Sequence, residues 1–247
     1  MPDYAPRMGV LRQAAGRAAR PLSPWLGSGV SVSPGGGQVV LTFDDGPTSG
    51  VTDRILPVLA ERGASATFFV LVNRARRSPA LLHEVREAGH EIALHGPDHR
   101  PLTSFGLREI ARRTRDARRE LEDLSGVRIR WFRPPYGKQG FGAVLAVRRL
   151  GLTPVLWEAG LYDWVDLPQA TRLERGLAET RPGSVVLMHD GFANAEDGVD
   201  DGPAPQVDRP ALVARTLDRL DDRGLVARSL DRALEMSDLV LVPRLRR

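Results

Sequence analysis

The sequence predicts an α/β fold, a (β/α) barrel with about seven parallel strands in a single domain. Apolar runs of strand length alternate with amphipathic runs of helix length from Val39 onward. A repeated strand–helix unit builds a parallel sheet with right-handed crossovers, and about seven such units fit the length of one barrel domain. An open doubly wound sheet is the alternative arrangement of the same units.

The expected strands are short runs rich in β-branched, aliphatic and aromatic residues. In chain order they lie at 39–43, 66–71, 91–94, 129–132, 154–157, 184–188 and 225–227. The helices expected between them carry apolar residues on one face and lie at 51–61, 79–88, 107–124, 143–150, 169–179 and 210–222. Glycines stand where these helices need a C-terminal cap, at Gly63, Gly89, Gly126, Gly151 and Gly224.

The composition excludes several classes of protein. The chain has 247 residues, 42% of them hydrophobic, which is enough to bury one large core. It has no cysteine, so disulfides and thiolate metal sites are excluded. Lys+Arg exceed Asp+Glu by 35 − 31 = 4, but the arginines are mixed with acids along the helix expected around 112–120. Such mixing is typical of a solvated helix face, so we expect no nucleic-acid partner.

The two ends of the chain differ from the middle. We expect an N-terminal arm and Gly-rich linker over residues 1–37, one domain over 38–240, and a basic C-terminal tail over 241–247. No apolar stretch of about 7–15 residues follows the early arginines, which argues against a secretory signal. No run of about 20 apolar residues predicts a membrane span. A cytoplasmic location is therefore expected, with the cell envelope or secretion as the alternative.

Two carboxylates close the first expected strand. Asp44 and Asp45 follow the buried run 39–43, and Gly46-Pro47 breaks the strand. Parallel α/β folds keep their reactive groups at the carboxyl ends of strands. Because neighbouring side chains on a strand point to opposite faces, both aspartates meet one substrate only where the strand gives way to a turn.

Two histidines follow the third expected strand. In His95-Gly96-Pro97-Asp98-His99, Gly96 is a candidate N-cap and Pro97 a candidate first residue of a helix, which would bring both imidazoles to one point. Two histidines and one carboxylate leave coordination positions open for water and substrate. Structural, hydrogen-bonded histidines are the alternative, but the nearby Asp-Asp strand end favours a divalent-metal site.

Charged residues follow three further strands. Arg133 comes after 129–132, and since a buried arginine needs a carboxylate, Asp44 is a suitable partner. A surface arginine in a Pro-rich loop is the alternative. His189 closes the run 184–188, and Asp163 lies in the loop after 154–157. Imidazolium general acids commonly have a carboxylate behind them, so Asp163 is the expected partner of His189.

Together and in this order, these residues resemble the motifs of the polysaccharide deacetylase family, also called the NodB-homology group or carbohydrate esterase family 4. The matching motifs are Thr42-Phe43-Asp44-Asp45-Gly46-Pro47, His95-Gly96-Pro97-Asp98-His99, Arg133-Pro134-Pro135-Tyr136, Asp163-Trp164 and Leu187-Met188-His189-Asp190. The resemblance extends over residues 39–230. It implies a deformed (β/α) barrel and divalent-metal hydrolysis of an N-acetyl group.

The resemblance also implies a metal-binding set and a base. By position in the motifs, Asp45, His95 and His99 would bind the metal, usually zinc, and Asp44 would be the general base, tethered by Arg133. Coordination would keep one aspartate ionised while the arginine keeps its neighbour able to take a proton, so two adjacent carboxylates receive different roles.

The remaining roles concern the leaving group and the acetyl group. By the same resemblance, His189 would be the general acid and Asp163 its partner, because an amide breaks at useful rates only when the leaving nitrogen is protonated. The backbone N–H of Tyr136 would help hold the oxyanion, and Trp164 and Leu187 would line the acetyl pocket.

Two departures from the family pattern stand out. The family usually has Ser or Thr where this chain has Gly96, so we expect a less supported metal site that Gly96→Ser would tighten. The stretch 190–208 has no Lys or Arg and six acids: Asp190, Glu196, Asp197, Asp200, Asp201 and Asp208. It is either a flexible loop that is solvated, binds calcium or pairs with neighbouring arginines, or a negative rim that attracts a cationic substrate.

The sequence therefore favours a metal-dependent carbohydrate N-deacetylase. Its expected substrate is an N-acetylglucosamine-containing glycan or a small aminosugar conjugate. The alternatives are a related C–N hydrolase acting on a cyclic amide or ureide, and a catalytically silent carbohydrate-binding protein. The particular sugar, the polymer length, the native metal and the oligomeric state are left open.

Overall fold

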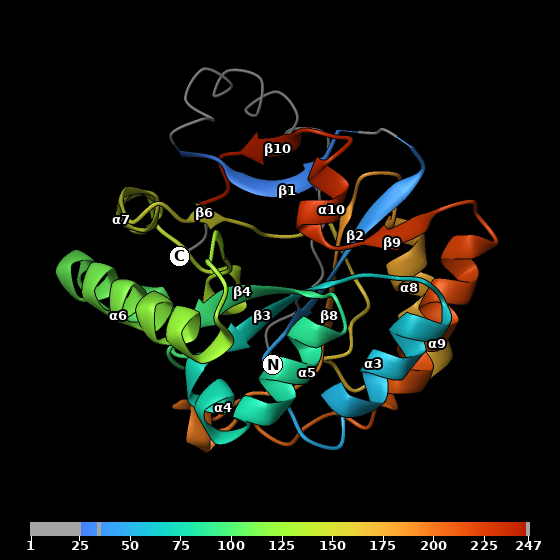
Figure 1. Cartoon of the computed structure of the whole chain (residues 1–247), viewed down its shortest axis with the longest axis horizontal. Helices are drawn as coiled ribbons and strands as arrows, with labels where there is room; N and C mark the ends of the chain where they lie inside the picture. The colour runs from blue at the N-terminus through green and yellow to red at the C-terminus, as the bar shows by residue number, and fades with distance from the viewer. Residues whose placement is uncertain (1–25, 34–35, 246–247) are drawn as a thin grey trace.

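A curled parallel sheet runs through the centre of the computed structural model, with helices around its outer side (Figure 1). The structure describes residues 26–33 and 36–245. Within them the sheet contains β2 (Gln38–Asp44), β3 (Thr67–Leu71), β4 (Glu91–Gly96), β5 (Trp131–Phe132), β6 (Thr153–Pro154), β7 (Ala159–Gly160), β8 (Val185–His189) and β9 (Val226–Arg228). The strand order is β6-β5-β4-β3-β2-β8-β7, with β9 beside β2, and all these pairs are parallel.

The helices follow the strands as crossover connections. They are α3 (Thr52–Glu61), α4 (Val72–Arg77), α5 (Pro79–Glu87), α6 (Leu107–Ser125), α7 (Phe141–Arg149), α8 (Gln169–Glu179), α9 (Arg209–Asp221) and α10 (Leu230–Leu234), with short 3-10 turns η2 (Leu102–Ser104), η3 (Pro135–Gly137) and η4 (Ala195–Asp197). In α6 the buried positions Ile110, Thr114, Ala117 and Leu121 recur every three or four residues, which is one face of a helix. No helix among the described residues is long and apolar enough to cross a membrane.

Strand β2 shows how the sequence pattern divides the core. Val39, Leu41 and Phe43 belong to the large cluster between sheet and helices. Val40 belongs to a second cluster inside the barrel, with residues of other strands such as Phe69. Because side chains alternate along a strand, every second residue after Val40 on β2 also points into the barrel. The last residue of β2, Asp44, therefore points into the barrel.

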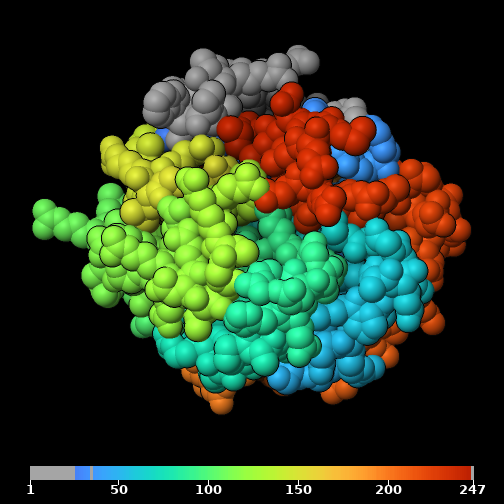
Figure 2. All heavy atoms as spheres, in the orientation of Figure 1, coloured from blue at the N-terminus to red at the C-terminus, as the bar shows by residue number. Residues whose placement is uncertain are grey.

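Strand β1 (Ser28–Val32) connects the region of β6, at one edge of the sheet, with the region of β8, the strand next to the other edge. Gly29 bridges to Val155, next to β6, and Ser31 bridges to Ser184, next to β8. The β1 strand also pairs antiparallel with β10 (Leu239–Val242). Figures 1 and 2 show the blue N-terminal and red C-terminal segments lying together on the same side of the molecule. The chain thus forms a deformed barrel in one domain, as the sequence predicted.

Each of the seven expected strands and of the six helices expected between them corresponds to an observed element. Five helices and strands were not expected: β1, α4, β7, α10 and β10. The two-residue β7 has no period to detect, and α4 is a six-residue helix rich in arginine. Strands β1 and β10 lie at the ends of the chain. Val30 and Val32 of β1 are 1% and 2% exposed, so this part of the expected arm 1–37 is packed against the domain, contrary to expectation. Most of that arm, residues 1–25, and residues 246–247 of the expected tail lie outside the described part of the chain.

Candidate active site at the carboxyl ends of the strands

The two aspartates at the end of β2 both face the barrel interior. Asp44 does so by strand parity, and Asp45 does so because its backbone adopts φ = 74°. This left-handed conformation is uncommon for residues other than glycine, although aspartate is among those that tolerate it. The turn begins at Asp45 itself, one residue before Gly46-Pro47. Both carboxylates are 3% exposed, so they are buried side by side.

His95 is brought to the site by an irregularity in β4. Val70 of β3 pairs with Leu94 and Leu71 pairs with Gly96, which leaves His95 as an extra residue without a partner across the sheet. A β-bulge of this kind re-aims a side chain and is common beside active sites. The Nδ1 atom of His95 lies 2.8 Å from the carbonyl oxygen of Arg133. Since a carbonyl only accepts, Nδ1 carries the proton and Nε2 presents its lone pair.

His99 reaches the same point from a turn. The helix expected to start at Pro97 is wrong: β4 ends at Gly96 and a bend follows until η2. Gly96 has φ = +149°, so the backbone leaves the strand in a direction that is not that of a helix N-terminus. The backbone N–H of His99 donates to the carbonyl oxygen of Asp197 at 2.9 Å. A later loop, rather than a helix, therefore holds this residue.

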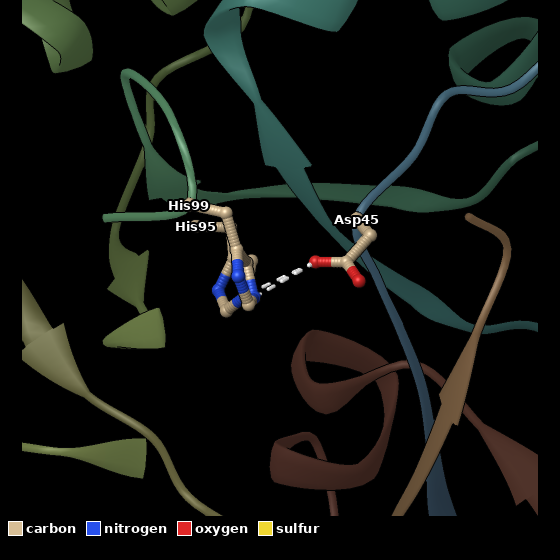
Figure 3. Close-up of side chains that lie close together, drawn as sticks. All are labelled: Asp45, His95 and His99. Carbon is tan, nitrogen blue, oxygen red and sulfur yellow. Dashed lines mark ion pairs between the residues drawn. The ribbon is translucent and has the colours of Figure 1, made fainter. Parts of the chain in front are cut away.

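Asp45, His95 and His99 form the one cluster of at least three His, Cys, Asp or Glu residues with metal-binding spacing among the described residues. Their ligand atoms lie within 4.8 Å of one another. The Nε2 atoms of His95 and His99 lie 3.4 and 3.2 Å from Asp45 Oδ1. In Figure 3 both imidazoles lie on the same side of the Asp45 carboxylate and point toward it.

The chemistry of this cluster fits a divalent cation. Asp45 Oδ1 is buried and accepts no hydrogen bond from the described residues, and the lone pair of His95 Nε2 is directed at it. Burial disfavours the ionised carboxylate, but the nearby imidazoles, His99 first, outweigh burial and hold the pKa of Asp45 well below its usual range. Converging nitrogen and oxygen donors of this kind suit zinc and related metals.

The expected contact between Arg133 and Asp44 is present. Arg133 Nη1 donates to Asp44 Oδ1 at 2.6 Å and to the Thr42 hydroxyl at 2.9 Å. Its Nε and Nη2 donate to the carbonyl oxygens of Val155 and Leu156 at 3.2 and 3.3 Å. The guanidinium is fully buried, and burial lowers the pKa of Arg133. Asp44 Oδ2 has no such bond with any described residue and lies 3.8 Å from His95 Nε2, so it faces the metal-binding cluster.

The expected contact between His189 and Asp163 is also present. His189 Nδ1 and the His189 backbone N–H contact the two carboxylate oxygens of Asp163 at 2.8 and 2.7 Å. Burial lowers the pKa of His189, but the charge of Asp163 and its hydrogen bond outweigh burial and raise it to about 9. In the sheet His189 is the direct neighbour of Asp44. With Nδ1 occupied, Nε2 of His189 is left for a substrate.

The three residues expected to bind substrate lie beside His99, beside His189 and on β8. Tyr136 adopts φ = 59° and packs its ring edge-on against the His99 ring, with centroids 4.4 Å apart. Trp164 packs edge-on against the His189 ring at 5.4 Å. Leu187 is 2% exposed on β8, next to Gly160. The structure brings all ten predicted site residues to one end of the barrel. Their chemical roles stay predictions.

One buried carboxylate beside the site was not assigned from the sequence. Asp190 accepts a hydrogen bond from the Thr52 hydroxyl at 2.6 Å, and burial raises its pKa to about 7. Its carboxylate fills the space where a side chain at Gly46 would begin, with Oδ2 1.9 Å from that position. The Asp-Gly pairs after β2 and β8 were the signal that these two turns contact each other.

The acidic stretch 190–208 is mostly paired rather than free. Asp197 is fully buried and binds Arg74, while Glu196 contacts Arg77 at 3.1 Å. Asp208 caps α9 through the Ala211 N–H. Pairing with the arginines of a neighbouring helix, α4, is therefore what the structure shows for the middle of the stretch, and the negative rim is reduced to Asp200 and Asp201.

Comparison with known proteins agrees with the motifs. A family model described as polysaccharide deacetylase matches residues 31–155. A chitooligosaccharide deacetylase of Sinorhizobium fredii is 34% identical over 196 residues, 77% of this chain and 88% of that protein. The peptidoglycan-N-acetylmuramic acid deacetylase PdaC of Bacillus subtilis is 32% identical over 171 residues, 69% of this chain and 36% of that protein. A family 4 carbohydrate esterase from Streptomyces lividans in complex with acetate aligns with a TM-score of 0.68 at 26% identity, over 83% of this chain and 97% of that one.

The fold and the cluster at its strand ends are those of a barrel hydrolase. The chain belongs to the polysaccharide deacetylase family, carbohydrate esterase family 4, as its motifs predicted. Its enzyme class is accordingly that of a carbohydrate N-deacetylase.

Proposed function

We propose that this protein removes the acetyl group from an N-acetylated sugar, with a divalent cation, zinc first among the candidates, held by Asp45, His95 and His99. The observation that carries the proposal is the position of these three residues beside Asp44 and His189, which are neighbours in the sheet. A bound divalent cation supplies Lewis acidity: it polarises the acetamide carbonyl and makes a nearby water easier to deprotonate.

Asp44 is the proposed general base. Its Oδ1 is held by Arg133, so Oδ2 faces the metal-binding cluster and is the oxygen that takes a proton from the attacking water. The fixed guanidinium stabilises the ionised carboxylate and restricts its rotation. Because both groups are buried, the pair excludes bulk water from this side of the site.

His189 is the proposed general acid. With a pKa raised to about 9, its imidazole is protonated at neutral pH and donates from Nε2 to the leaving nitrogen. Asp163 fixes the ring by accepting from Nδ1. Asp163 is itself held in place because Arg209 Nη2 donates to its backbone oxygen at 3.4 Å and Arg172 Nη1 donates to that of Tyr162 at 3.0 Å.

The acetyl group is the part of the substrate that the remaining residues would bind. Trp164 and Leu187 offer apolar surface next to His189, which suits a methyl group. The backbone N–H of Tyr136, on a turn stiffened by Pro134 and Pro135, is the proposed hydrogen-bond donor to the developing oxyanion. The products would be acetate and a free amine on the sugar.

Acetate release by the zinc-loaded enzyme tests the proposal. We expect turnover of N-acetylated oligosaccharides, with chitooligosaccharides screened first because the Sinorhizobium fredii relative is named for them. Peptidoglycan fragments and small N-acetyl aminosugar conjugates complete the panel. Asp44→Asn and His189→Ala should each lose most of the turnover while retaining metal. No acetate release from any of these substrates would contradict the proposal.

Metal content tests the site independently of substrate. Elemental analysis should find one zinc per chain in the wild type and little in a His95→Ala/His99→Ala variant. His83→Ala is the matched control, since this histidine is exposed on α5 away from the cluster. Full occupancy in the double variant would rule out the assigned ligands.

A further inference from the structure

The two histidines of the metal-binding cluster differ in what supports them. His95 Nδ1 is 2.8 Å from the Arg133 carbonyl oxygen. His99 Nδ1 is buried and has no hydrogen-bond partner among the described residues, although the residue is only 7% exposed. A metal-binding histidine usually donates its outward N–H to a carboxylate, a carbonyl or a water, which fixes its tautomer and ring orientation. His99 therefore needs a partner.

Asp201 is the carboxylate that lies in the right place. Its Oδ2 is 3.9 Å from His99 Nδ1. A hydrogen bond requires these atoms about 1 Å closer, and the Asp201 side chain is 33% exposed, so it has room to move that far. Nothing in the sequence singled it out from the other acids of the stretch 190–208.

Tyr136 orients the Asp201 carboxylate toward the cluster. The Tyr136 hydroxyl lies 2.9 and 2.7 Å from the two carboxylate oxygens. The same ring packs edge-on against the His99 ring, with centroids 4.4 Å apart. One phenol thus touches both the acid and the imidazole, and it closes a triangle of three side chains from three separate segments of the chain.

The segment that carries Asp201 is itself fixed to the cluster. Asp197 accepts from buried Arg74 on α4, and its backbone oxygen accepts from the His99 N–H at 2.9 Å. A capping box between Asn194 and Asp197 closes η4. The stretch 190–208 therefore contacts the backbone of His99 through Asp197 and approaches its ring through Asp201.

We propose that Asp201 is a positioning residue for His99. Its carboxylate accepts the His99 Nδ1–H and so keeps the Nε2 lone pair directed at the metal, while the Tyr136 hydroxyl holds the carboxylate in place. The proposal rests on the proposed metal site, and it gives the acidic stretch a role in metal affinity rather than in attracting a cationic substrate.

Zinc affinity, measured by chelator competition, tests the role directly. Asp201→Ala should bind zinc about 10- to 100-fold more weakly, the range found when an outer partner of a metal-bound histidine is removed. Asp201→Asn keeps an oxygen acceptor and should recover part of this loss. Tyr136→Phe keeps the ring but frees the carboxylate, and we expect a smaller loss.

Asp200→Ala is the matched control. It removes the same charge one position earlier in the chain, from an exposed side chain whose Oδ1 accepts a hydrogen bond from the Gly202 N–H at 3.4 Å. If the acidic loop acted only by long-range attraction for the cation, both alanine variants would lose zinc affinity to the same extent. The positioning role predicts that zinc affinity falls by ten-fold or more only in Asp201→Ala.

A spectroscopic readout separates positioning from loop stability. In the zinc-loaded wild type, nitrogen NMR of the histidine rings should show His99 protonated at Nδ1, with that proton protected from exchange. Asp201→Ala should lose the protection. Zinc affinities that are equal in Asp201→Ala and Asp200→Ala, with protection unchanged, would overturn the inference. Absence of zinc binding in the wild type would instead overturn the proposed function.

Discussion

Asp44 and Arg133 form a 2.6 Å ion pair inside the barrel, with side chains that are 4% and 0% exposed. The guanidinium reaches across from the end of β5 to the end of β2, and its other donors bind the Thr42 hydroxyl and two carbonyl oxygens. The Arg133 side chain has no exposed surface through which solvent could replace these partners. The pair therefore combines a structural contribution with the proposed catalytic one, and the two can be measured separately.

Removing the arginine should destabilise the protein strongly. Arg133→Met leaves the Asp44 carboxylate buried without its partner, which typically costs about 3–5 kcal/mol. The double variant Asp44→Asn/Arg133→Met has no buried charge and should recover much of that loss. Denaturant unfolding of both variants measures the difference. Arg112→Met is the control: Arg112 pairs with Glu109 on the exposed face of α6, where an ion pair is worth about 0–1 kcal/mol. Equal losses at the two arginines would contradict the argument.

The pair of His189 and Asp163 should make stability depend on alkaline pH. The pKa of His189 is about 9 in the folded state against 6.5 for an ordinary histidine. The folded chain therefore binds the proton more tightly than the unfolded one. The stabilisation is fully present below pH 6.5 and is lost as the pH rises through about 9. Asp163→Asn should remove this contribution. The free energies of unfolding of the wild type and the variant should therefore differ most at pH 6 and least above pH 9.

NMR titration of the His189 ring measures the same shift directly. In Asp163→Asn the pKa of His189 should fall, and the alkaline limb of the pH–rate profile should move down with it if His189 is the acid. Asp166→Asn is the matched control because this neighbouring carboxylate is 83% exposed and does not contact His189. A His189 titration that is unchanged in Asp163→Asn would contradict the assigned pairing.

Asp190 should give the free energy of unfolding a second dependence on pH, in a more acidic range. Its pKa rises from 3.8 to about 7 because the carboxyl is buried. Between these values the folded state holds a proton that the unfolded state has lost, so the free energy of unfolding should decrease as pH rises from 4 to 7. Asp190→Asn should flatten this decrease. Asp53→Asn, in the first turn of α3, is the exposed control, and an unaltered slope in Asp190→Asn would show that Asp190 is ionised throughout.

Local order fixes one part of the site that the sequence predicted, whereas the contacts of Arg133 with Asp44 and of His189 with Asp163 were predicted because charged groups at the ends of buried strands need partners. Asp44 and Asp45 end a strand, and His95 and His99 are four residues apart, so their proximity follows from short segments of chain. The Asp201–Tyr136 contact joins residues 65 apart, and it depends on how the loop after β8 packs against η3. No periodicity or motif encodes such a contact.

Backbone detail was the other limit of sequence reasoning. The bulge at His95 depends on the register between β3 and β4, which the sequence of β4 alone does not contain. The pairing of β1 with β10 joins the two ends of the described chain, so neither short strand was recognisable in isolation. The expected helix at Pro97 failed because local capping preferences were overridden by the backbone direction at Gly96.

Gly96 reverses one expectation drawn from the sequence, that a serine there would tighten metal binding. Its φ of +149° is rarely adopted by other residues, and a Cβ at this position would lie 2.8 Å from the Asp98 carbonyl oxygen. Gly96→Ser must therefore shift the backbone between His95 and His99, which carries both imidazoles. We expect it to weaken zinc binding in chelator competition and to lower the melting temperature.

Gly106→Ser is the matched control, since Gly106 caps α6 with φ = −70° and a Cβ there meets nothing within 4 Å. It should leave zinc affinity unchanged and, as a favourable N-cap, leave stability the same or slightly higher. Tighter zinc binding in Gly96→Ser alone would show that the turn rearranges to place the new hydroxyl behind a histidine.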